Sequence, residues 1–386
     1  MEKIFKIIFM VIMFVSCFFP NFQDSLTTKS ASEADYRNLG IPLSEYYPDG
    51  IPARTPWDVE IYDEKLFVAA GDYDKNSGPV PIYYYDIASQ NWVNSGTVPD
   101  EQIEHFKVIH NTLMIPGCDP QCHWDYGSIY VYENKQWTNQ HNIPGGVHQF
   151  DLVEFQDEIF VGLGILPGNT PIAKSTDGGK TFCPADIYKN GTKLDTTVPP
   201  DAKAVQLRVY DFFTFNGQLF AYYCRFIDNV IENEIYRYEN GAFYYHQNLT
   251  GPITINRSTY RVFDEKTEYQ GKLYFTTGNL YTTSDFQTIE HIPLVENSIV
   301  TDLCVIEDSL YVITAIKHPH GTYRTTLWRR QNGSQELYED ILFFDFPCPA
   351  QCFTYNNGIL YFGMGDGILS ESNPYNGTIL SIDIVE

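Results

Sequence analysis

The stretch "DFFTFNGQLF" at residues 211–220 reads as a strand, a tight turn at Asn216 and Gly217, and the start of a second strand. Asn-Gly between alternating aromatic and aliphatic residues is a strong short-range signal for a β-hairpin. The same ten-residue pattern recurs without gaps along the chain. The other copies lie at 58–67, 105–114, 151–160, 265–274, 302–311 and 352–361. Each copy therefore predicts one hairpin.

The copies start 37 to 60 residues apart, which leaves room for two further strands after each hairpin. A period of this length with four short strands in each repeat is typical of a β-propeller. We therefore predict an all-β chain that forms a seven-bladed β-propeller over residues 51–386. The C-terminal stretch 377–386 reads as a strand, and the segment 25–50 is expected to add a strand that closes the ring and leaves no sheet edge exposed.

The N-terminus has the features of an export signal. Lys3 and Lys6 precede an apolar run that is short for a membrane span, so residues 1–24 are predicted to be a signal peptide and no membrane span is expected. The chain is then secreted or periplasmic. The stretch "FVSC" ending at Cys17 resembles a lipoprotein box, which leaves a lipid anchor at the cell surface as an alternative.

Seven cysteines follow Cys17. Cys118 and Cys122 lie four residues apart in "GCDPQCH", and Cys348 and Cys352 do so in "PCPAQC". In an exported protein each pair predicts a local disulfide. A structural zinc held by Cys118, Cys122 and His123 is the alternative for the first pair. A structural calcium is also left open, and no cofactor is expected to be required for function.

The segment "STDGGKTF" at 175–182 matches the Asp-box pattern that is found in sialidase-like propellers, and "TTSDFQTI" at 282–289 looks like a degenerate copy. An Asp box is a turn between the outer strands of a blade. We expect Asp177 to accept hydrogen bonds from backbone amides there, and we assign the motif a structural role.

Basic residues recur at the start of the repeat, as in "HQFD" at 148–151, "RVYD" at 208–211 and "RVFD" at 261–264. In a propeller these positions lie at one end of the central axis, together with the loops that follow each hairpin. The residues sorted to this mouth are His105, His123, His148, Tyr188, Arg208, Tyr210, Arg225, Tyr260, Arg261, His318 and His320. They predict a cationic mouth on a chain of formal net charge −24. An acidic carbohydrate fits such a mouth, whereas the overall charge disfavours nucleic acid.

The order His123, His148, Tyr188 and Arg208 resembles the His, His, Tyr and Arg set of seven-bladed propeller ulvan lyases. These enzymes cleave a sulfated polysaccharide of uronic acid and rhamnose by β-elimination. The resemblance implies that His123 and His148 transfer protons, that Tyr188 is a second acid or base, and that Arg208 holds the uronate carboxylate. The predicted substrate-binding residues are His105, Tyr210, Arg225, Tyr260 and Arg261. Removal of water from a terminal uronate by a dehydratase uses the same proton abstraction.

Two other functions remain open. A sialidase-like glycoside hydrolase is one, although "ARTPWD" at 53–58 is a poor copy of the sialidase arginine motif. Other retaining or inverting glycosidases need two carboxylates that flank the bond, which Asp72 and Asp366 would supply. A non-catalytic propeller that binds sugar or protein is the other alternative. For the two arginines themselves a structural role is also open, in which Arg208 and Arg261 pair with Asp211 and Asp264 and hold blades together. We expect a monomer in each case.

Overall fold

The computed structural model describes residues 31–120, 126–228, 230–249, 262–331, 338–366 and 372–384. The predicted signal peptide and Cys17 lie outside these ranges. The helical segments of the described residues are three short 3-10 turns at Pro48–Gly50, Pro52–Arg54 and Tyr73–Lys75. None of the helices found there is long and apolar enough to cross a membrane. The described chain is therefore built from β-sheets.

Five of the sheets are separate and have four or five strands. The first contains β3 (Val59–Tyr62), β4 (Lys65–Val68), β5 (Val80–Asp86) and β6 (Asn91–Val98). The second contains β8 (Lys107–Ile109), β9 (Thr112–Pro116), β11 (Tyr126–Glu133) and β12 (Gln136–Pro144). Later in the chain a sheet is formed by β23 (Glu265–Tyr269), β24 (Lys272–Thr276), β25 (Leu280–Thr283) and β26 (Ile289–Ile292).

The last two of these five sheets recruit the N-terminal segment. One contains β27 (Ile299–Ile306), β28 (Ser309–Lys317), β29 (Tyr323–Gln331) and β30 (Glu339–Phe346), with β1 (Ser32–Glu33) parallel to β30. The other contains β31 (Ala350–Asn356), β32 (Ile359–Met364) and β33 (Thr378–Asp383), with β2 (Arg37–Gly40) antiparallel to β33. The beginning of the described chain thus pairs with its end.

The remaining strands form a ten-stranded sheet and a two-stranded one. The large sheet begins with β13 (Gly146–Phe155), β14 (Glu158–Ile165), β15 (Ile172–Ser175) and β16 (Cys183–Pro184). It continues with β17 (Ile187–Lys189), β18 (Thr192–Lys193), β19 (Val205–Phe215), β20 (Gln218–Ile227), β21 (Val230–Glu239) and β22 (Ala242–Asn248). The small sheet pairs β7 (Asp100–Gln102) with β10 (Cys118–Pro120).

All seven predicted hairpins are present as antiparallel pairs, namely β3–β4, β8–β9, β13–β14, β19–β20, β23–β24, β27–β28 and β31–β32. The sequence signal lies in their two-residue turns. Asn216 and Gly217 have φ of 50° and 69°, and Asn357 and Gly358 have φ of 48° and 83°. Positive φ at both central positions is the type I′ geometry, whose twist matches that of the flanking strands.

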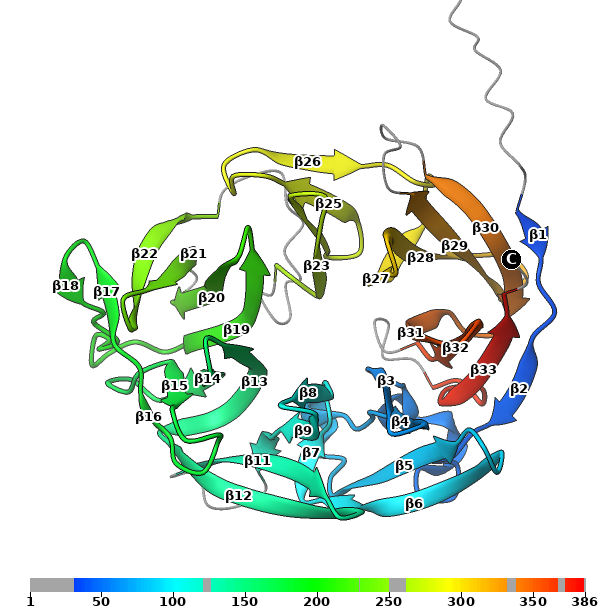
Figure 1. Cartoon of the computed structure of the whole chain (residues 1–386), viewed down its shortest axis with the longest axis horizontal. Helices are drawn as coiled ribbons and strands as arrows, with labels where there is room; N and C mark the ends of the chain where they lie inside the picture. The colour runs from blue at the N-terminus through cyan, green and yellow to red at the C-terminus, as the bar shows by residue number, and fades with distance from the viewer. Residues whose placement is uncertain are drawn as a thin grey trace, which may run out of the picture. The chain divides into compact units, whose positions relative to one another are not determined.

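Apolar clusters join each sheet to the next one in the chain, and the innermost strands follow one another around a common axis (Figure 1). One cluster closes the series, because Val59 and Leu66 of the first sheet pack with Cys352 and Tyr361 of the last. The fold is therefore all-β and propeller-like, as predicted. The predicted seven blades do not appear as seven separate four-stranded sheets, since five sheets have four or five strands and ten strands are joined in a single sheet.

A carboxylate bridge recurs between the innermost strands. Oδ2 of Asp58 accepts a hydrogen bond from the backbone N–H of Phe106 at 2.8 Å. Asp151 binds the N–H of Phe212 in the same way at 2.8 Å, and Asp302 binds that of Phe353 at 2.8 Å. Each aspartate is the first residue of one decapeptide, and each donor is the second residue of the next decapeptide. The repeated Asp therefore fastens one hairpin to the following one.

Two lysines complete this inner network. Nζ of Lys107 lies 2.8 Å from Asp151 Oδ1, and Nζ of Lys266 lies 2.7 Å from Asp211 Oδ1 and 3.8 Å from Asp151 Oδ2. Burial opposes ionisation of Asp151, but Lys107 and Lys266 hold the pKa of this carboxyl well below its usual range. Because Asp211 pairs with Lys266, its expected partner Arg208 is left for other contacts.

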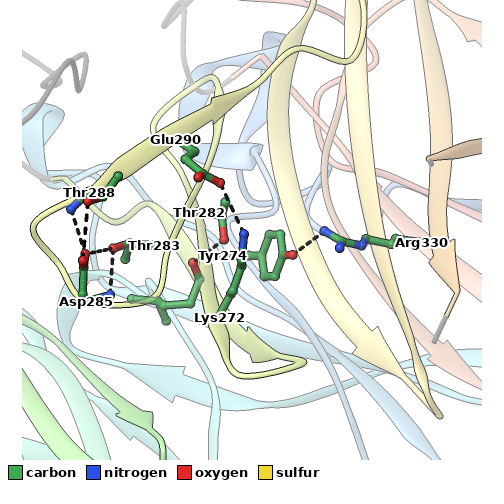
Figure 2. A network of polar contacts seen from close by, with 9 residues as sticks. Lys272, Tyr274, Thr282, Thr283, Asp285, Thr288, Glu290 and Arg330 are labelled. Atoms are coloured by element: carbon green, nitrogen blue, oxygen red, sulfur yellow. Dashed lines mark hydrogen bonds and ion pairs between the residues drawn. The ribbon is translucent and has the colours of Figure 1, made fainter. Parts of the chain in front are cut away.

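The Asp box forms the expected turn between β15 and β16. Asp177 accepts hydrogen bonds from the Thr181 backbone N–H at 2.9 Å and from the Thr181 hydroxyl at 2.7 Å. The degenerate copy between β25 and β26 forms a similar but tighter turn, since Asp285 accepts the N–H of Thr288, three residues on instead of four, at 2.7 Å (Figure 2). Figure 2 also shows Arg330 reaching from β29 to the hydroxyl of Tyr274 on β24. The motif caps outer strands, as expected for a structural element.

The predicted disulfide between Cys348 and Cys352 is wrong, because both residues are buried free thiols. Their sulfur atoms lie 3.6 Å from the carbonyl oxygen of Tyr375 and 3.3 Å from that of Pro56, respectively. Cys118 is buried, and its predicted partners Cys122 and His123 lie outside the described residues, so the disulfide and the zinc site proposed for this stretch stay predictions. No group of three or more His, Cys, Asp or Glu side chains that could hold a metal ion occurs within the described ranges.

Replacement of Asp151 by Ala removes the acceptor for the Phe212 N–H and leaves Lys107 and Lys266 without their shared carboxylate. We expect the free energy of unfolding to fall by about 3 kcal/mol, since breaking a buried ion pair from one side leaves an uncompensated charge. Urea denaturation measures this loss. Asp383→Ala, at an exposed position of β33, is the control and should change stability by less than about 0.5 kcal/mol. An equal, small effect of both variants would contradict the bridging role.

Candidate functional site

His148 lies near the start of β13 and contacts an aspartate of another sheet. Its Nδ1 is 3.2 Å from Oδ1 of Asp119 on β10, and the two side chains are 20% and 25% exposed. Burial, and secondarily the charge of Arg208, lowers the pKa of His148 to about 3. The imidazole is therefore neutral at ordinary pH, and its contact with Asp119 joins a neutral ring to a carboxylate instead of two opposite charges.

Arg208 lies on β19 and is held by aromatic rings. Its Nη1 donates a hydrogen bond to the Tyr210 hydroxyl at 2.8 Å, and the guanidinium carbon lies 5.3 Å from the centre of the Phe150 ring. The Phe150 ring also stacks on His148, with centroids 5.3 Å apart and planes inclined by 16°. Phe150 thus contacts both the neutral imidazole and the cation.

Sheet register places these two side chains close together. His148 of β13 pairs with Gly164 of β14, and Gly164 pairs with Arg208 of β19. Gly164 lies between His148 and Arg208 in this row and has no side chain, so no side chain of this row separates the imidazole from the guanidinium. Gly164–Arg208 is the pair that joins β14 to β19 within the ten-stranded sheet.

Carboxylates of the two-stranded sheet border this site. Burial and the neighbouring Asp74 raise the pKa of Asp119, against the opposing charge of Arg208. Burial and Asp119 raise the pKa of Glu101. Burial likewise raises the pKa of Asp100 to about 6, although Tyr130 donates a hydrogen bond to it. Asp119 is thus an electrostatic neighbour of Arg208 and itself lies near further carboxylates, so the predicted cationic mouth also contains acidic side chains at this place.

Tyr188 does not join His148 and Arg208. It lies on β17, which pairs with the outer strand β22, and its ring stacks on that of Tyr244 with centroids 5.4 Å apart. Four strand-to-strand steps separate β17 from β19 in the sheet order, or roughly 19 Å at the usual strand spacing. After β16 the chain crosses to β22, the outer strand of the next four strands β19–β22, and β17 pairs there. This crossing was not predicted from the sequence.

The other predicted residues have separate placements. Arg225 on β20 forms an ion pair with Glu232 on β21 at 3.1 Å, and Tyr210 is buried beneath Arg208. His105 is half-buried and precedes β8. His318 and His320 stack on each other with centroids 5.2 Å apart, and His318 Nε2 lies 3.5 Å from Asp345 Oδ1. His123, Tyr260 and Arg261 lie outside the described residues.

Three residues of the site were missed from sequence. Asp119 lies inside "GCDPQCH", where the cysteines suggested only a disulfide or a metal. Phe150 is the aromatic residue of "HQFD", and Gly164 lies in the run "VGLG" at 161–164 that follows the third hairpin. The last two could have been found by aligning the positions around each repeat, whereas Asp119 depends on the packing of β10 against β13.

This arrangement can bind an anion and accept a proton. A guanidinium is suited to holding a carboxylate, and a neutral imidazole beside an aspartate has the form of a general base.

No protein-family model matches the chain, and no curated protein matches it. Solved structures are similar in fold. A chain of the structure described as "Crystal Structure of Mitotic Checkpoint Complex" has 12% identity and a TM-score of 0.50, over 95% of this chain and 97% of that one. Raptor from Chaetomium thermophilum has 9% identity and a TM-score of 0.52, over 92% of this chain and 29% of that one.

Hydrazine synthase from Kuenenia stuttgartiensis has 12% identity and a TM-score of 0.50, over 87% of this chain and 96% of that one. Identities this low concern the fold alone. The descriptions of the three structures share no activity, so they assign no chemistry to this chain.

Replacement of Arg208 by Gln removes a positive charge that lowers the pKa of His148. We expect the pKa of His148 to rise but to stay below its ordinary value of 6.5, because burial, the larger cause, is retained. Nuclear magnetic resonance titration of the imidazole measures this change. Arg225→Gln is the matched control, since Arg225 is paired with Glu232, and it should leave the titration of His148 unchanged. An unshifted His148 in the Arg208 variant would show that the two groups do not interact.

Proposed function

We propose that the protein is an exported carbohydrate-active enzyme that performs β-elimination on a uronic-acid-containing poly- or oligosaccharide, as a lyase or a dehydratase. The observation that carries the proposal is the Asp119–His148 contact of 3.2 Å beside Arg208. It supplies a neutral base and a cation at one place, which are the two groups that proton removal next to a carboxylate requires.

In the proposed reaction Arg208 binds the uronate carboxylate and stabilises the negative charge that develops when the adjacent carbon loses its proton. Nε2 of His148 accepts that proton. The electron pair of the broken C–H bond forms a carbon–carbon double bond while the bond to the leaving oxygen breaks. The protonated His148 then returns the proton to the leaving oxygen, so a single residue serves both sides of the reaction.

Asp119 has the role of holding His148 in the tautomer with the proton on Nδ1. The bound substrate would also raise the pKa of His148. Its carboxylate, bound to Arg208, offsets the positive charge that lowers this pKa, so the imidazole becomes a stronger base in the complex than in the free protein. Tyr188 has no part in this scheme, because it lies at the outer edge of the sheet.

A non-catalytic module for acidic sugars is the second candidate. The observation that favours it is the low pKa of His148, about 3, since a base of this strength accepts a proton poorly near neutral pH. A sialidase-like hydrolase receives less support. Asp366 is buried and accepts a hydrogen bond from Tyr323 at 3.0 Å, so it is not presented as a catalytic acid.

We propose that the fold has seven blades. In this reading the ten-stranded sheet is two four-stranded blades, β13–β16 and β19–β22, joined on the inside by the Gly164–Arg208 pair and on the outside by β17 against β22. Each of the seven then begins with one predicted hairpin.

We also propose export by the N-terminal segment 1–24, with Cys17 as the point of lipid attachment if the chain is anchored.

Purified protein mixed with ulvan or its oligosaccharides should produce ultraviolet absorbance from unsaturated uronate. His148→Ala should abolish this signal because the base is lost. Asp119→Asn should reduce it about 100-fold or more, since the amide can hold the wrong tautomer. Tyr188→Phe is the control and should keep full activity. Binding without any absorbance, for the wild type and all uronate polymers, would identify a binding module instead.

A further inference from the structure

The ten-stranded sheet contains two glycines that allow unusually close approach. A methyl group at Gly162 would lie 2.6 Å from the carbonyl oxygen of Val209 on β19. At Gly164 it would lie 2.9 Å from Cδ2 of His148 and 2.9 Å from Cε2 of Phe150. Real side chains almost never tolerate such contacts, because repulsion between atoms rises steeply below van der Waals distance. A side chain at Gly162 would therefore collide with backbone, and one at Gly164 would force the His148 and Phe150 rings to move.

We infer that Gly164 is a positioning residue, which sets the place of His148 and Arg208 relative to each other for the proposed reaction. The register carries this inference, since Gly164 is the paired neighbour of His148 on one side and of Arg208 on the other. The His148 and Phe150 rings occupy the space that a side chain at 164 would fill. The inference rests on the proposed function for its catalytic consequence, but the geometric part stands on the sheet alone.

The chain offers a matched control in another sheet. Gly164 lies four residues after the end of the decapeptide 151–160. Gly365 lies four residues after the end of the decapeptide 352–361, so the two glycines are equivalent in the repeat. A methyl group at Gly365 would lie 2.8 Å from Cγ2 of Thr55, so crowding of similar severity occurs away from His148. Neither glycine is among those described with a positive φ, and alanine is compatible with both backbones.

The experiment compares Gly164→Ala with Gly365→Ala. Both should lower the thermal unfolding midpoint. Only Gly164→Ala should displace the His148 ring from its buried place, so the pKa of His148, followed by nuclear magnetic resonance, should rise towards its ordinary value. With a uronate substrate, kcat should fall about 100-fold for Gly164→Ala, as expected when a catalytic group moves by about 1 Å, and should be nearly unchanged for Gly365→Ala.

Should Gly164→Ala fail to fold, the double variant Gly164→Ala/Phe150→Val removes one of the two clashing atoms, and its titration is compared with that of Phe150→Val alone because Phe150 itself stacks on His148. An unchanged His148 titration in the folded variant would overturn the inference. Absence of turnover in the wild type would instead refute the proposed function and leave the titration as the test of positioning. A pKa change of equal size in Gly365→Ala would show a general structural effect and would also overturn the inference.

Discussion

The structure depends on one repeated interaction, in which the carboxylate of an aspartate on or just before an inner strand accepts a hydrogen bond from a backbone N–H of the next hairpin. Asp58, Asp151 and Asp302 all make this bond. The donors Phe212 and Phe353 directly follow irregular positions of their strands, where the pairing register shifts between Val209 and Asp211 and between Ala350 and Cys352. A buried donor without a partner is costly, so the bond fixes how successive hairpins approach.

The candidate site lies beside this anchor. Asp151 fastens β13 to β19, and the residues just before Asp151 and Asp211 include His148, Phe150 and Arg208. The recurring "HQFD" and "RVYD" stretches thus combine two functions. Their aspartates bind the inner network, in which Lys266 neutralises Asp211, and their basic residues are free to meet across Gly164. The hydrogen bonds and ion pairs of the inner-strand aspartates therefore determine which side chains lie together in the candidate site.

The hairpins were predictable because their turns carry a local signal, such as Asn216-Gly217 with positive φ at both positions. His148 and Arg208 were predictable as partners because the repeat places them equivalently. The position of Tyr188 was not, since it follows from β17 crossing to β22, a pairing between distant segments. Asp119 was missed for the same reason, and the thiols of Cys348 and Cys352 were misread because spacing alone does not report on burial or strand direction.

The most direct test of the central claim is a crystal structure of the His148→Ala variant with an intact uronate oligosaccharide. The account predicts that the uronate carboxylate replaces the Tyr210 hydroxyl as a partner of Arg208. The carbon next to that carboxylate should then face the space vacated by the imidazole, near Asp119. A uronate bound elsewhere on the protein, with Arg208 still bonded only to Tyr210, would contradict the assignment of this site.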